Sequence, residues 1–495
     1  MSTAKKFAGQ TAVYGISTIA GRVLSFFLTP IYTKAYAPAA YGILTTMFSY
    51  VSILNAIMAF GMETTFFRYL NKHENNKQRV YNNAFASVFS ITIIFLLLTL
   101  PFTGQIANFI KVGKGTSHAD FVSYIDYFIA ILIIDAWCVI PFAKIRAEGK
   151  PGKYSIIKFI NILFFIGLNL LFIWGLPFWI RHQLIGSGWI SHWYIKGWIG
   201  YVFLSNLIGS VLTFLLLLPE LLKIRFDFDG KMLKEMYAYS WPIVIANLSF
   251  IVNENLDKLL LGKLLPQNIS VHDVGVYGAC AKISLFLSIF VQAFRLGAEP
   301  FFFSHVKNKN AGQTYARIMN YFVIAVCLIF IALISNIEIL KYFIPNKSYW
   351  IGLDVVPPLV FGYVSLGVYM NLSVWYKLSD QTKYGLYISG IGAILTIVLN
   401  VLFIPKYSYM ASAWVSLIAY TVMMILSYLW GQKNYPIPYN VKKNLAYIIS
   451  SILIVFLSFY IFKRNIFAGD ALLIIYALAA CYFERKDLKA IFNKQ

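Results

Sequence analysis

Long apolar stretches separated by short polar breaks run along the whole chain. A helix needs about 20 mostly apolar residues to cross a hydrocarbon core about 30 Å thick. Stretches close to this length fall near residues 11–32, 41–66, 82–103, 121–142, 154–175, 198–219, 240–262, 274–303, 316–335, 353–376, 384–404, 410–430, 443–462 and 468–483. The pattern predicts an all-α polytopic membrane protein with about 14 transmembrane helices.

The composition supports this prediction and argues against several other classes of protein. Of the 495 residues, 59% are apolar, 18% are aromatic and only 13% are charged, whereas soluble domains carry about 25% charged residues. These proportions argue against a large soluble catalytic domain, a disordered protein and a disulfide scaffold. No polar break is long enough to hold an extramembrane domain, so the helical bundle and its loops must carry the function.

Motifs for bond-making chemistry are missing from the chain. The segment Gly113-Lys114-Gly115-Thr116 lacks the upstream glycine of a P-loop, because Asn108 stands at that position. The six histidines are scattered, with no H-E-x-x-H motif and no Cys/His pairing, so no metal site is expected. We therefore expect a protein that is not an enzyme and that carries no cofactor.

The placement of charge indicates the orientation in the membrane. The 42 Lys and Arg against 20 Asp and Glu give a formal net charge of +22, which in a soluble protein would suggest nucleic acid. In membrane proteins, basic residues gather instead in cytoplasmic loops. With the breaks assigned to alternate sides, the side of both tails holds 26 Lys and Arg and the other side holds 11. Both termini are predicted to be cytoplasmic, and no nucleic-acid partner is expected.

Weak internal similarity indicates two related halves. Tyr41-Gly42 recurs as Tyr277-Gly278, and 277 minus 41 gives an offset of 236. At this offset, without gaps, the chain also matches Arg22 with Lys258, Pro30 with Pro266, Gly61 with Gly297, Glu63 with Glu299, and Phe66-Phe67 with Phe302-Phe303. Because transporters often contain repeats, we predict two pseudo-symmetric six-helix lobes, 1–235 and 236–434, with a binding cavity between them. Two additional C-terminal helices and a cytoplasmic tail follow in 435–495.

Basic residues inside the predicted spans are candidates for substrate binding. A charge near the bilayer centre costs about 2.5–3.5 kcal/mol, so it normally faces a wet cavity or a partner. Arg22 and Lys258 are equivalent in the repeat, and Lys282 and Arg295 lie 13 residues apart on one helix, about 20 Å at 1.5 Å per residue. The four residues predict a row of cationic sites for an anionic group such as phosphate or pyrophosphate.

A structural explanation of these charges stays open. Asp257 adjoins Lys258 and Glu254 precedes it by four residues, so that helix could satisfy its own charges. Lys158 sits near a helix end and could reach the interface. Four acidic residues in the spans are candidates for a coupling cation, H+ or Na+: Asp126, Asp135, Glu254 and Asp257.

Two glycine and glutamate pairs lie at the inner ends of corresponding helices. They are Gly61 with Glu63 in the first lobe and Gly297 with Glu299 in the second. One interpretation is a gate that combines a close helix crossing with a reversible ion pair. The other is an ordinary helix end with glycine packing.

The opening of the chain resembles a known family. Segment 21–33 (GRVLSFFLTPIYT), then Ala40-Tyr41-Gly42 and segment 60–69 (FGMETTFFRY), are similar to the start of bacterial polysaccharide biosynthesis proteins. These are the O-antigen (Wzx-type) repeat-unit flippases of the multidrug/oligosaccharidyl-lipid/polysaccharide (MOP) exporter superfamily. The predicted lobes and extra helices resemble its 14-helix members across essentially the whole chain, an architecture shared with lipid II flippases (MurJ) and drug/cation antiporters (MATE).

The resemblance implies a function and a location. It implies movement of an undecaprenyl-pyrophosphate-linked oligosaccharide from the cytoplasmic to the periplasmic leaflet of a bacterial inner membrane, by alternating access. The cationic cavity of the family maps onto Arg22 and Lys258, and also onto Lys282 and Arg295. Membrane lipids and a downstream polysaccharide polymerase are the implied partners. The alternatives are a multidrug or cation antiporter of the same superfamily and a membrane-embedded polysaccharide polymerase or ligase.

Overall fold

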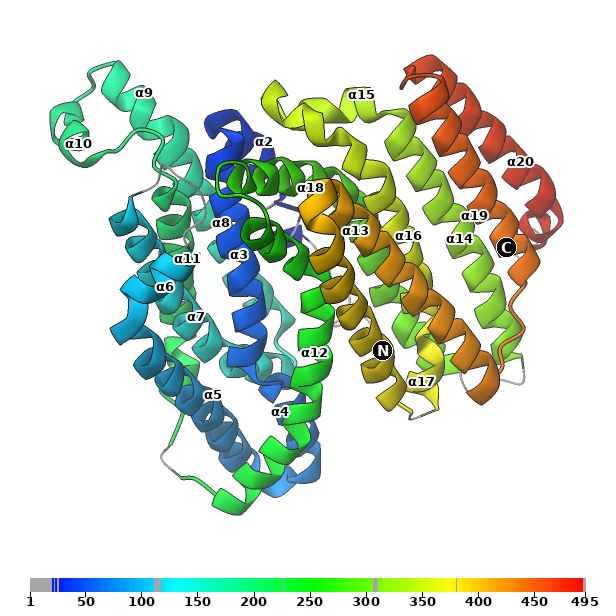
Figure 1. The fold of residues 1–495 in the computed structure, drawn as a ribbon. Coiled ribbons are helices and arrows are strands. Elements are labelled where there is room, and N and C mark those ends of the chain that lie inside the picture. Colours follow the sequence, from blue (N-terminus) through cyan, green and yellow to red (C-terminus); the bar gives the residue numbers. More distant parts are fainter. Residues whose placement is uncertain are drawn as a thin grey trace. The chain divides into compact units, whose positions relative to one another are not determined.

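The computed structural model describes residues 20–21, 23–24, 26–110, 117–225, 227–305, 310–379 and 381–492. The side chains of these residues are described except those at 246, 296, 299–300, 303–305 and 486–492. All elements within these ranges are helical, which confirms the prediction of an all-α protein. The chain forms two compact units, Met1–Gly275 and Val276–Gln495, which are coloured blue to green and green to red in Figure 1.

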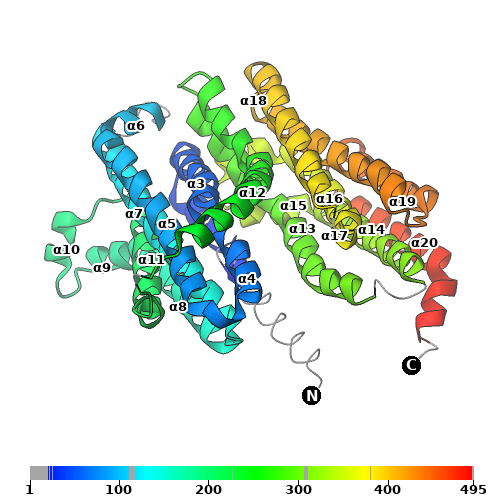
Figure 2. The same ribbon diagram turned by 90° about the horizontal axis from the view of Figure 1, so that it is seen from below.

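The N-terminal unit is built from long helices and short connecting ones. Its elements are α2 (Leu28–Ala35), α3 (Pro38–Ala59), α4 (Met62–Lys72), η1 (Glu74–Asn76), α5 (Lys77–Thr99), η2 (Leu100–Phe102), α6 (Thr103–Ile110), α7 (His118–Ala147), α8 (Pro151–Leu170), η3 (Leu171–Gly175), α9 (Leu176–Arg181), α10 (Ser187–Trp193), α11 (Gly200–Leu221), α12 (Gly230–Leu264) and the first turns of α13 (Ser270–His305). In both ribbon views α9 and α10 stand apart from the other helices of this unit (Figures 1 and 2).

The C-terminal unit contains the rest of α13 and the following helices. These are α14 (Ala311–Ser335), α15 (Ile337–Leu340), η4 (Lys341–Phe343), η5 (Lys347–Val355), α16 (Val356–Leu372), α17 (Val374–Leu378), α18 (Lys383–Asn434), α19 (Val441–Phe456), η6 (Leu457–Ile461) and α20 (Ile466–Phe492). The last helices are joined by polar contacts, because Lys443 and Tyr447 of α19 donate to the buried carboxylate of Glu484 on α20 at 2.7 and 2.8 Å.

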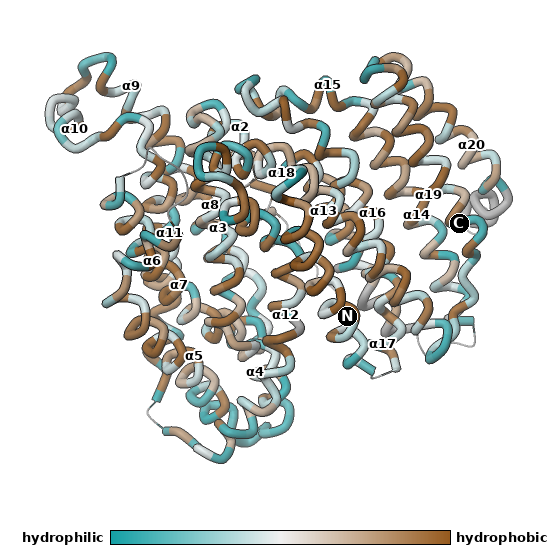
Figure 3. Tube along the Cα trace, viewed as in Figure 1, coloured by the Kyte–Doolittle hydropathy of each residue, from teal (hydrophilic) through white to brown (hydrophobic). Residues whose placement is uncertain are grey.

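Eleven helices in the described part of the chain are long and apolar enough to cross a membrane. One of them, α18, covers two predicted spans and bends at Ser408, where φ is 48°. Of the other predicted spans, 240–262 lies in α12, which carries Glu254, Asp257 and Lys258, and half of 11–32 falls outside the described residues. The total of 14 stays a prediction, while the multi-pass membrane class is confirmed. In Figure 3 the hydrophobic colour runs along the helices.

Local sequence signals explain several helix boundaries. Phe60 and Gly61 both adopt left-handed conformations, with φ of 44° and 62°, and they separate α3 from α4. The side chain of Asp229 accepts hydrogen bonds from the backbone N–H groups of Met232 and Lys231, both at 3.0 Å, and so caps α12. These backbone hydrogen bonds lower the pKa of Asp229 below its ordinary value.

Two glycines allow a backbone contact inside the N-terminal unit. A Cβ atom on Gly42 would lie 1.9 Å from the carbonyl oxygen of Val271, and one on Gly275 would lie 1.8 Å from that of Pro38. No side chain fits at such distances, so the start of α3 and the start of α13 meet through their backbones.

The predicted lobe boundaries at 235 and 434 are based on the internal sequence similarity, and they stay a prediction.

Candidate functional site

Lys258, a predicted substrate ligand, is held by its own helix. Its ammonium Nζ lies 2.9 Å from Oδ1 of Asp257 and donates to the carbonyl oxygen of Glu254 at 2.6 Å. The Asp257 side chain is only 2% exposed, and burial strengthens an ion pair with good geometry. Lys258 is therefore paired within its own helix, by the carboxylate of Asp257 and by the backbone carbonyl, not the carboxylate, of Glu254. Arg22, the equivalent of Lys258 in the repeat, lies outside the described residues.

The acidic residues predicted for ion coupling have different surroundings. Asp135 on α7 is half-buried and lies near Ser210 of α11 and Lys158 of α8. The Lys158 ammonium also lies 4.3 Å from the centre of the Phe142 ring. Asp126, on the same helix as Asp135, is exposed. Of the two, Asp135 thus belongs to a polar group between three helices of the N-terminal unit, and its coupling role stays a prediction.

The predicted gate residues also differ in their local geometry. A Cβ atom on Gly61 would meet Cγ2 of Ile243 at 3.1 Å, so α4 begins close against α12, and Glu63 forms an ion pair with Arg146 of α7. A Cβ atom on Gly297 would meet no described atom within 4 Å. The side chain of Glu299 lies outside the described residues. Gly61 and Glu63 therefore combine close packing and an ion pair within the N-terminal unit, and a role as a gate stays a prediction.

Arg295, a predicted substrate ligand, lines a pocket inside the C-terminal unit. We call this the inner pocket, because Lys377, which also lines it, falls in a break predicted to be cytoplasmic. Its lining includes Phe294, Arg295, Phe322, Gly367, Asn371 and Lys377. They come from α13, α14, α16 and α17, and Phe294 and Phe322 form an aromatic wall with ring centres 4.4 Å apart. Lys282, the other predicted ligand on α13, is half-buried and is not among the lining residues.

Asn371 gives the inner pocket an unusual hydrogen-bonding capacity. Its side chain is only 6% exposed, and its buried Nδ2 has no hydrogen-bond partner in the described part of the chain. A buried amide donor without a partner carries a desolvation penalty, which a bound acceptor would remove. A guanidinium, an ammonium and an amide donor on one pocket together suit an anionic group such as a phosphate.

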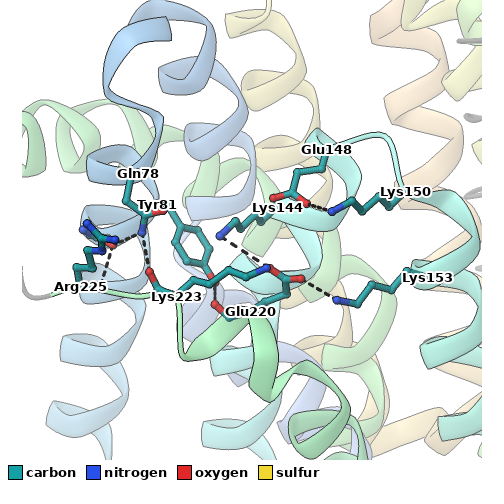
Figure 4. Close-up of polar contacts among 10 residues, drawn as sticks. Gln78, Tyr81, Lys144, Glu148, Lys150, Lys153, Glu220, Lys223 and Arg225 are labelled. Carbon is teal, nitrogen blue, oxygen red and sulfur yellow. Dashed lines mark hydrogen bonds and ion pairs between the residues drawn. The ribbon is translucent and has the colours of Figure 1, made fainter.

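A second charged cluster lies at the ends of α7, α8 and α11 in the N-terminal unit (Figure 4). Its centre is the Glu220 carboxylate, 1% exposed, which lies 2.7 Å from Nζ of Lys153, 2.8 Å from that of Lys223 and 3.8 Å from that of Lys144. The Lys144 ammonium also lies 4.1 Å from the centre of the Tyr81 ring, and the Tyr81 hydroxyl donates to the Glu220 carbonyl at 2.9 Å. We call this the Glu220 cluster.

The edge of the Glu220 cluster carries a more exposed pair. Lys150 donates to Glu148 at 2.6 Å, and this hydrogen bond, together with the charge of Glu148, raises the pKa of Lys150 above its ordinary value. In the sequence these lysines contribute only to the predicted cytoplasmic charge. The available signal was Glu220 at the end of the apolar stretch 198–219, but its partners are far away in the chain.

Comparisons with known proteins agree with this architecture. Residues 7–303 match the family model described as polysaccharide biosynthesis protein, and residues 242–402 match the model described as MatE. An uncharacterized membrane protein of Methanocaldococcus jannaschii is 22% identical over 451 residues, which cover 84% of this chain and 83% of that protein.

Solved structures share the fold. The lipid II flippase MurJ in an inward closed conformation superposes with a TM-score of 0.72 at 17% identity, covering 96% of this chain and 100% of that one. A multidrug resistance MATE transporter of the MOP superfamily, in an inward-facing conformation, has a TM-score of 0.64 at 13% identity, covering 86% of this chain and 94% of the other.

Proposed function

Because the chain belongs to the polysaccharide biosynthesis protein family, we propose that it is a flippase for undecaprenyl-pyrophosphate-linked oligosaccharide repeat units. It is a multi-pass membrane protein with the fold of the MOP superfamily. The proposed transport runs from the cytoplasmic to the periplasmic leaflet of a bacterial inner membrane by alternating access. A downstream polysaccharide polymerase would receive the flipped unit.

The inner pocket is the observation that carries this proposal. Arg295 and Lys377 supply positive charge to it, and Asn371 supplies a buried donor without a partner in the described residues. A pyrophosphate offers several acceptor oxygens, so it suits a fork from Arg and a point charge from Lys. The inner pocket has a volume of only about 10 Å³ in this conformation. In this proposal it widens during alternating access so that Arg295, Lys377 and Asn371 contact the pyrophosphate on the cytoplasmic side, while Arg22, Lys258 and Lys282 guide it through the predicted cavity between the lobes.

Reconstituted vesicles test the role of the inner pocket. The double variant Arg295→Gln with Lys377→Gln should slow the exposure of lipid-linked glycan at least about tenfold, as expected when two charge-assisted contacts are lost. A matched control is Arg317→Gln with Lys383→Gln, which removes two exposed cations outside the inner pocket. A second variant, Arg22→Ala with Lys258→Ala, tests the predicted cavity. Equal flipping by native protein and by both site variants would exclude this mechanism.

Efflux of amphipathic cations is a second candidate, favoured by the MatE match over residues 242–402. In that case Asp135, which lies near Lys158 and Ser210, would bind a coupling H+ or Na+, and Asp126, Glu254 and Asp257 are its alternatives. Deleting the gene separates the two functions. Cation sensitivity with normal surface polysaccharide supports efflux, whereas loss of surface polysaccharide without cation sensitivity supports the flippase.

A further inference from the structure

A large groove lies at the α9–α10 extension of the N-terminal unit. We call it the outer groove, because the break 176–197 is predicted to face away from the cytoplasm. Its volume is about 890 Å³, within the range of small-molecule sites. Its lining includes Trp174, Phe178, Arg181, His182, Tyr194 and Lys196. Figures 1 and 2 show α9 and α10 standing apart from the rest of this unit.

The outer groove carries positive charge that its own segment does not balance. Residues 171–200 contain Arg181 and Lys196 but no Asp or Glu. Both cations are exposed, and neither has an ion pair or hydrogen bond among the described residues. Since basic residues without acidic neighbours attract anions, the groove is electrostatically suited to a negatively charged ligand.

The walls of the outer groove are fixed by contacts outside it. The Tyr194 ring stacks on Tyr201, with centres 5.2 Å apart and planes at 4°, and Tyr201 stacks on Phe172 at 4.7 Å and 9°. The Tyr194 hydroxyl donates to the carbonyl oxygen of Phe172 at 2.9 Å. A wall held in this way loses little freedom when a ligand binds.

The groove joins a membrane helix to its interface. One end lies at η3, a turn of π-helix at Leu171–Gly175, and such turns are rare and frequent at functional sites. Trp174 and Phe178 expose apolar surface there, at the end of the candidate span Pro151–Arg181. Arg181 is the last residue of this span, and Lys196 lies beyond it. This order, apolar first and cationic next, matches a lipid with its chains in the bilayer and its phosphate at the interface.

We propose that the outer groove binds an anionic phospholipid of the surrounding membrane. Arg181 and Lys196 hold its phosphate, His182 lies beside them, and the acyl chains lie along Trp174 and Phe178. The site is separate from the inner pocket and does not depend on what the protein transports. An anionic phospholipid rather than a zwitterionic one is favoured, because two cations without acidic partners face the groove.

Native mass spectrometry of the purified full chain tests this site. At equal lipid concentrations the native protein should retain phosphatidylglycerol at least about fivefold better than phosphatidylcholine, since each basic residue near an anionic headgroup contributes about a fivefold gain. Arg181→Gln with Lys196→Gln should lower phosphatidylglycerol retention at least about tenfold. The charge-conserving pair Arg181→Lys with Lys196→Arg should retain most of the binding.

The matched control is Lys347→Gln with Lys406→Gln. Both residues are exposed and lie in breaks predicted on the same side, so this pair removes the same charge and should leave retention unchanged. Equal loss in both glutamine pairs would mean that general charge, and not the groove, attracts the lipid, and it would overturn the proposal. Displacement of phosphatidylglycerol by an equal concentration of undecaprenyl phosphate would also overturn it, because the groove would then prefer the polyprenyl carrier.

Discussion

The Glu220 cluster and the inner pocket use similar residues in opposite ways. In the first, three lysines surround one buried carboxylate, with the nearest ammonium 2.7 Å away. In the second, Arg295 and Lys377 line a pocket together with an amide donor that has no partner in the described residues. In the Glu220 cluster the lysines pair with a buried carboxylate, so they form a structural contact between helices. A pocket lined by a buried donor without a partner in the described residues is suited to accept a ligand instead.

The largest expected effect comes from removing the charge at the centre of the Glu220 cluster. Glu220→Gln keeps the size of the side chain but leaves three lysines without their carboxylate. Breaking a buried ion pair costs about 3–5 kcal/mol, and exposure of Lys153 and Lys223 reduces this to about 2–3 kcal/mol. Thermal unfolding of the detergent-purified protein measures the loss. The control, Glu235→Gln, disrupts the exposed pair with Lys72 and should change the unfolding temperature little.

A smaller effect of opposite sign is expected at the inner pocket. Asn371→Leu replaces an unsatisfied buried amide by an apolar group of similar size, so the protein should gain about 0.5–1.5 kcal/mol of stability. The same change should slow flipping of lipid-linked glycan in vesicles. A variant that is less stable than the native protein would show that Asn371 is a structural residue, and the contrast with Glu220 would fail.

The smallest effect is expected at the edge of the Glu220 cluster. The Glu148 contact raises the pKa of Lys150, so it favours the folded protein below the ordinary lysine pKa. This contribution is lost as the pH rises through the raised pKa. Because Lys150 is largely solvated, Glu148→Gln should lower the unfolding temperature only slightly at pH 7. The difference from the native protein should disappear at strongly alkaline pH, as melting curves at several pH values would show.

Sequence reasoning succeeded where an interaction is local. The apolar stretches gave the helices, because length and hydropathy are properties of a continuous segment. That Lys258 could be satisfied within its own helix was foreseen as an alternative, and its ion pair is with the adjacent Asp257. The predicted pair with the Glu254 carboxylate is replaced by a hydrogen bond to the Glu254 backbone carbonyl. Gly61 was singled out, and its left-handed φ of 62° fits the break between α3 and α4.

The missed residues are partners from distant parts of the chain. Lys377 lines the inner pocket with Arg295 although 82 residues separate them (377 minus 295). Lys153 and Glu220 are 67 residues apart. The sequence shows Lys377, Lys153 and Glu220 as ordinary charges near helix ends, and nothing in the spacing connects them with their partners. The same holds for Asn371, because only folding buries its side-chain amide where the described residues offer it no hydrogen-bond acceptor.

The amino-acid sequence alone determined that this is a helical membrane protein, and it identified the charged residues inside the spans that need an explanation. Hydrophobic length and charge placement suffice for this, because the bilayer acts on each segment separately. Only the tertiary structure decided which charges neutralise each other, as around Glu220, and which line a pocket or groove, as Arg295 and Arg181 do. Electrostatic energy depends on distance and burial, and both are set by how the helices pack.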